Sequence, residues 1–168
     1  MLRPAHAAAA VALAGTSAAL QADRAAAQAA ARTTGAAECA VHSLCVVPAA
    51  AAAALGGGAG GELLLVATRS CACYLITARG ALVRAFASPS PREKGGEFTA
   101  ATLSPRGALV YAASEAGELH VFDAATGRLE HTLRVTEGKR EVVGIAHHPH
   151  RNLVATWSAE GALKLWRP

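Results

Sequence analysis

The chain has 168 residues, which suits one domain better than two. Its net charge is +4 and no dense Lys/Arg block occurs, so its charge gives little support to nucleic-acid binding. No run of about eighteen strongly apolar residues is present, and four cysteines (Cys39, Cys45, Cys71 and Cys73) are too few for a disulfide framework, so we expect no membrane partner and no disulfide-rich fold.

Residues 1–37 are dominated by alanine and offer few large side chains to bury. We interpret them as an alanine-rich extension that is disordered or helical, because alanine has the best helix propensity. The alternative is a targeting segment over residues 1–32, which contains Arg3 and an apolar run from Ala7 to Ala14. Targeting would send the chain to an organelle or the secretory route.

From about residue 40 the chain alternates short apolar segments with Gly, Pro, Ser and charged residues, a pattern typical of antiparallel β structure. A second alanine- and glycine-rich stretch, residues 49–61, interrupts this pattern and is predicted to be a flexible loop between two strands. The predicted strands are 41–47, 62–68, 73–77, 82–87, 98–103, 109–113, 119–123, 129–135, 142–147, 153–157 and 163–166.

A repeat of 44 residues gives the strongest signal. It relates Ser114 to Ser158, Gly117 to Gly161 and Phe122-Asp123 to Trp166-Arg167, and Ser70 precedes Ser114 by the same interval. A period of 40 to 45 residues with four strands per unit is typical of WD-repeat propeller blades. The glycines suit a tight turn with positive φ, and Phe122 and Trp166 take the place of the motif tryptophan. Arg167 replaces the usual aspartate, so we expect the Asp–His–Ser/Thr–Trp hydrogen-bond network to be incomplete.

These observations predict an all-β, partial WD40 propeller over residues 38–168. Its blades would span 38–88, 97–135 and 141–168, and the last would lack its outer strand. Three blades are fewer than the four to eight of closed propellers, so the chain reads as the C-terminal part of a longer propeller. We expect such an open stack to associate with itself or to need the missing blades.

Candidate chemistry is sparse. Basic residues in the two inter-blade connections (Arg92, Lys94, Lys139 and Arg140) are candidate partner-binding residues, or else solubilising loop charge. No aromatic residues accompany them, so we expect no direct nucleic-acid readout. His147-His148-Pro149-His150 is interpreted as a turn rather than a metal site, and Cys71 and Cys73 as packed thiols. We predict no catalytic residues, no cofactor and no metal.

The runs LSPRG, GIAHHPH and LKLW, within residues 95–168, resemble the C-terminal blades of the Smu-type (suppressor-of-mec-and-unc) WD-repeat family. VHSLCVVP and the segment 66–86 resemble the preceding blade. The resemblance implies a nuclear scaffold that acts in pre-mRNA splicing with proteins of the spliceosome as partners. Family members also carry an N-terminal LisH/CTLH helical module, to which no segment here corresponds. The alternatives are a generic WD40 scaffold in an unrelated complex and, less favoured, a propeller enzyme.

Overall fold

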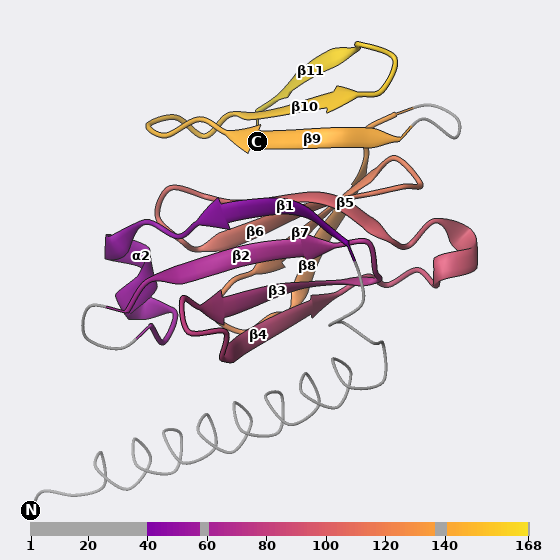
Figure 1. Ribbon diagram of the computed structural model, residues 1–168. Coiled ribbons are helices and arrows are strands. Elements are labelled where there is room, and N and C mark those ends of the chain that lie inside the picture. The colour runs from indigo at the N-terminus through magenta and orange to yellow at the C-terminus, as the bar shows by residue number, and fades with distance from the viewer. Residues whose placement is uncertain (1–39, 58–60, 137–140, 168) are drawn as a thin grey trace, which may run out of the picture.

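Three antiparallel sheets make up the computed structural model, which describes residues 40–57, 61–136 and 141–167 (Figure 1). The first sheet contains β1 (Val41–Val46), β2 (Leu63–Thr68), β3 (Ala72–Thr77) and β4 (Leu82–Ala87). The second contains β5 (Phe98–Leu103), β6 (Leu109–Ser114), β7 (Glu118–Asp123) and β8 (Leu129–Arg134). The third contains β9 (Val142–His147), β10 (Val154–Ser158) and β11 (Leu163–Trp166). The predicted all-β fold of about three blades, the last without a fourth strand, is confirmed. The predicted extension over 1–37 lies outside the described residues.

The strand register repeats from sheet to sheet. Val110 pairs with Phe122 in the second sheet, and Val154 pairs with Trp166 in the third. In each case the two partners are twelve positions apart, so Phe122 and Trp166 occupy equivalent places, as the 44-residue spacing predicted. Gly117 and Gly161 have φ values of 75° and 81°, the left-handed conformation expected of the turns that precede these strands.

The strands of the first sheet pair in the same pattern, but their spacing in sequence from the equivalent strands of the second sheet is not 44 residues. Ala67 pairs with Cys73 as Ala113 pairs with Leu119, so the residue equivalent to Ser114 is Thr68. The predicted correspondence between Ser70 and Ser114 is therefore wrong. Ser70 instead stabilises the turn after β2, because its hydroxyl lies 2.9 Å from that of Thr68 and accepts a hydrogen bond from the Ala72 amide.

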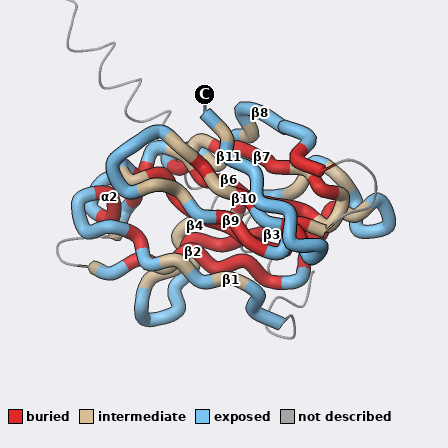
Figure 2. The backbone as a smooth tube through the Cα atoms, turned by 90° about the horizontal axis from the view of Figure 1, so that it is seen from above, coloured by how far each residue is buried: buried red, intermediate tan, exposed pale blue. Residues whose placement is uncertain are grey.

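Side chains of the second sheet fill two separate gaps. Leu119 and Val121 pack against the third sheet, whereas Phe122 packs against the first, because successive strand residues point to opposite faces. The ring centroids of Phe122 and Phe86 lie 5.6 Å apart across the first gap. The middle strands β2, β3, β6 and β7 are mostly buried, whereas β1, β8 and β11 are mostly exposed (Figure 2).

Strand β5 is the point of closest approach between sheets. It contacts β1 and β2 on one side and β9 on the other. The Ser43 hydroxyl donates to the carbonyl oxygen of Ala101 at 3.2 Å, and the Thr99 hydroxyl donates to that of Val142. In each gap, one hydrogen bond therefore links β5 to the neighbouring sheet in addition to the apolar contacts. These bonds hold the sheets close together along β5.

The alanine- and glycine-rich stretch is not a loop throughout. Residues Ala49–Ala54 form the short helix α2, so the prediction of a flexible loop over 49–61 is wrong for this part. The helix follows Pro48, and Gly56, with a φ of 91°, comes just after its end. Ala51 and Leu55 are buried in the core between the first two sheets. Small side chains suffice here because the helix packs directly against the backbone turn at Gly107.

Gly107 and Gly161 give a matched test of this packing. Both have positive φ, but a Cβ on Gly107 would lie 2.3 Å from that of Ala51, whereas one on Gly161 would meet nothing within 4 Å. We expect Gly161→Ala to lower the free energy of unfolding by about 1–2 kcal/mol through backbone strain alone. Gly107→Ala should cost about 1–3 kcal/mol more because the core is overpacked. Equal losses in urea denaturation would show that α2 does not pack on this turn.

Candidate protein-interaction surface

The ends of the strands form two rims. The turns β2–β3, β6–β7 and β10–β11 lie at one end, together with the links that join successive sheets. Ala116 in one such turn donates its amide to the carbonyl of Gly95 in a link at 3.0 Å, and Glu115 donates to Glu97 at 2.9 Å. We call this end the linker rim. The opposite end, which carries α2 and the turn at Gly107, is the far rim.

Two of the four predicted partner-binding residues lie on the linker rim. Arg92 and Lys94 are the first and last residues of a short 3-10 helix, η1 (Arg92–Lys94), in the link between the first two sheets. Both residues are exposed. Lys139 and Arg140 lie outside the described residues. The Arg92 guanidinium Nε lies 2.6 Å from a carboxylate oxygen of Glu97, so this cation is engaged by its own chain, whereas no ion pair found among the described residues involves Lys94.

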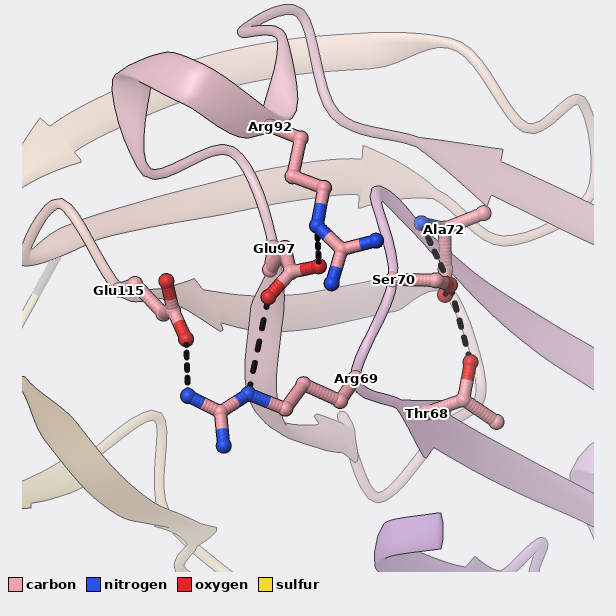
Figure 3. A network of polar contacts seen from close by, with 7 residues as sticks. All are labelled: Thr68, Arg69, Ser70, Ala72, Arg92, Glu97 and Glu115. Carbon is pink, nitrogen blue, oxygen red and sulfur yellow. Dashed lines mark hydrogen bonds and ion pairs between the residues drawn. The ribbon is translucent and has the colours of Figure 1, made fainter. Parts of the chain in front are cut away.

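A network of ion pairs joins the first two sheets at the linker rim (Figure 3). Glu97 is buried, with a side chain only 5% exposed, and its carboxylate faces both Arg92 and Arg69. The Arg69 Nε lies 3.6 Å from Glu97, and its Nη2 donates to Glu115 at 3.0 Å. The hydrogen bond to Glu115 is the main cause of the raised pKa of Arg69. Because Arg69 belongs to the first sheet and both glutamates to the second, the network fastens one sheet to the next.

The serine and aspartate of the repeat stabilise turns. The Ser114 hydroxyl lies 3.4 Å from both the amide and the carbonyl oxygen of Glu118, across the turn that contains Gly117. Asp123 accepts hydrogen bonds from the amide and the hydroxyl of Thr126, each at 2.7 Å. The side-chain bond from Thr126 is the main reason that the pKa of Asp123 is lowered. Ser158 is buried at the position equivalent to Ser114.

Trp166 retains one hydrogen bond of the motif network. Its indole Nε1 donates to the Thr156 hydroxyl at 2.9 Å, whereas Phe122 at the equivalent place has no donor. Thr156 was not predicted as a site residue, although a threonine ten residues before the motif tryptophan, in the preceding strand, is a usable signal. In the second sheet, the Thr132 hydroxyl lies 3.1 Å from Nδ1 of His120. These contacts join strands within a sheet, so they stabilise blades rather than bind a ligand.

Burial shifts the pKa values of several titratable groups in the direction that favours their neutral forms. Burial lowers the pKa of His120, opposed by the nearby Glu118, so a neutral imidazole packs beside Phe98 with the ring centroids 5.7 Å apart. Burial raises the pKa of the Cys71 and Cys73 thiols, which disfavours the reactive thiolate. Over the described ranges, no group of three or more His, Cys, Asp or Glu is arranged to hold a metal, and no helix is long and apolar enough to cross a membrane.

The two outer faces of the stack are apolar and open. Leu163 takes the register position of Leu119, but it is 65% exposed, whereas Leu119 is 1% exposed, because the described residues contain no sheet that covers the outer face of the third. On the first sheet, Val46 takes the position of the buried Leu103 and is 63% exposed. The large apolar side chains exposed on these faces are Val41, Leu44, Val46, Val143, Trp157, Leu163 and Leu165. Exposed patches of this kind mark interaction surfaces.

Comparison with known proteins supports a WD40 repeat. The chain is 36% identical over 75 residues to the WD40 repeat-containing protein smu1 of Dictyostelium discoideum. The match covers 45% of this chain and 14% of that protein, so the chain corresponds to a small part of the relative's length. No family model matches the chain. The name of this relative, the repeated register and the three sheets all agree with WD40-type blades.

Glu97 and Glu93 provide a test of the ion-pair network. Glu97→Gln removes the buried charge that faces Arg69 and Arg92, so we expect the free energy of unfolding to fall by about 1–3 kcal/mol in urea denaturation. Glu93→Gln, an equally small change at an exposed position of the same link, should alter it by less than about 0.5 kcal/mol. Two variants of equal stability would show that the network does not join the sheets.

Proposed function

We propose that the chain acts as a non-enzymatic protein-interaction scaffold of the WD40 type. The observation that carries this proposal is the repeated register, in which Phe122 and Trp166 occupy equivalent places in successive sheets. Sheets stacked in this way hold the turns at their ends in fixed positions, and recognition residues on a rigid scaffold are commonly found in such loops. The matched WD40 protein supports the same assignment.

The cellular role that we propose is pre-mRNA splicing in the nucleus, within the spliceosome. Support comes from the name of the matched relative, smu1, and from the resemblance of the runs LSPRG, GIAHHPH and LKLW to the Smu-type family. The 75 matched residues amount to 45% of the chain. A generic scaffold in another complex is the alternative that the experiment below distinguishes.

The linker rim is the proposed contact surface for these partners. Lys94 is exposed there, and Lys139 and Arg140 belong to the next link along the chain. Arg92 has a different role in the proposal, because its ion pair with the buried Glu97 holds η1 against the second sheet. Changing Arg92 would disturb the scaffold itself, so the test leaves it in place.

Affinity purification from nuclear extract tests both parts of the proposal. The tagged full chain should enrich spliceosomal proteins about tenfold over the tag alone in quantitative mass spectrometry. The variant Lys94→Glu/Lys139→Glu/Arg140→Glu should lose most of this enrichment, since a charged rim steers and orients partners. A charge-matched control, Arg79→Glu/Arg128→Glu/Arg167→Glu, alters exposed residues away from the linker rim and should retain it.

The possible outcomes separate the alternatives. If the chain enriches one defined complex without spliceosomal proteins, the splicing role is wrong and the generic scaffold is supported. If both triple variants retain the full enrichment, the linker rim is not the contact surface. If nothing is enriched over the tag alone, the scaffold proposal itself fails.

A further inference from the structure

A cleft of about 560 Å³ lies on the far rim between the second and third sheets. One wall is the turn after β5, which contains Arg106, and the other is the turn after β9, which contains His150 and Arg151. Its size falls within the range of about 300–1,000 Å³ common for ligand sites. These turns are the SPRG and HPHR runs of the repeat, to which the proposed function assigns no role.

The cleft is positively charged. Arg106 and Arg151 are both exposed and lie on opposite walls, and no aspartate or glutamate lines the cleft. None of the ion pairs found among the described residues involves either guanidinium. This differs from the linker rim, where Arg69 and Arg92 are paired with carboxylates of their own chain. The two far-rim cations are therefore available to an external anion.

The interior of the cleft is held in place by hydrogen bonds. The rings of Tyr111 and His147 lie together with centroids 5.5 Å apart. The His147 Nδ1 donates to the carbonyl oxygen of His148 at 2.8 Å, and its Nε2 is buried with no hydrogen-bond partner among the described residues. The His148 Nδ1 accepts from the amides of His150 and Arg151, at 3.1 Å each, and so fixes the turn that carries Arg151.

We propose that this cleft binds an acidic peptide segment of a partner protein. Side-chain carboxylates of the segment would pair with Arg106 and Arg151, because a guanidinium matches a carboxylate in charge and in its paired donors. A nucleic acid fits less well, because Tyr111 is only 8% exposed and packs on His147, so it offers no free ring face on which a base could stack.

Fluorescence anisotropy with the full chain tests this proposal. A fluorescein-labelled oligoglutamate peptide should bind about tenfold more tightly than the oligoglutamine peptide of the same length, and added salt should weaken its binding. The variant Arg106→Glu/Arg151→Glu should weaken oligoglutamate binding by at least about tenfold. The control Arg79→Glu/Arg134→Glu changes the net charge by the same amount at exposed sites outside the cleft, and should stay within about twofold of the unchanged chain.

The results that would contradict this proposal can be distinguished from failure of the proposed function, because the cleft lies on the far rim and Lys94 on the linker rim. Equal binding of the two peptides, or equal loss of binding in the two double variants, would overturn the proposal. So would tighter binding of a single-stranded oligouridylate that only Arg106→Glu/Arg151→Glu abolishes, since the cleft would then be a nucleic-acid site. Circular dichroism and thermal unfolding of both variants should match those of the unchanged chain, since all four arginines are exposed and none takes part in an ion pair found among the described residues.

Discussion

The structure depends on one constraint: the second sheet must pack on both of its faces at once. Its strands meet this constraint by alternation, since Leu119 and Val121 fill the gap to the third sheet while Phe122 fills the gap to the first. A slip of one residue in pairing would exchange the two sets of side chains, so the register is strongly specified. The hydrogen bonds of β5 to both neighbours and the ion pairs of Glu97 add to this packing at particular points.

The same alternation explains which apolar side chains remain exposed. At the two ends of the stack, equivalent side chains such as Val46 and Leu163 have no neighbouring sheet and remain exposed. Along the rims, by contrast, the turns carry charge, partly neutralised by internal pairs at the linker rim and unpaired in the cleft that contains Arg106 and Arg151. The chain thus has exposed apolar side chains at the two ends of the stack and charged turns along its rims.

Sequence reasoning located most of the fold, because alternating aliphatic and aromatic residues between turn residues determine strands locally, and the 44-residue spacing aligned Phe122 with Trp166. The predictions from the sequence were wrong or incomplete where a local structure depends on contacts with residues far away in the chain. Helix α2 packs through Ala51 against Gly107, more than fifty residues away in the chain. The pairing of Arg69 with Glu97 and the cleft between the second and third sheets likewise bring together residues far apart in the chain, and no local pattern reports such contacts.

The most direct test of this account compares one substitution at two equivalent positions. Leu119 and Leu163 share a residue type and a register position, but Leu119 is buried between sheets and Leu163 lies on the open face. Leu119→Ala should lower the free energy of unfolding by about 2–5 kcal/mol, and Leu163→Ala by less than about 0.5 kcal/mol, in urea denaturation of the full chain at low concentration. Losses of equal size would contradict the stacked arrangement of the three sheets.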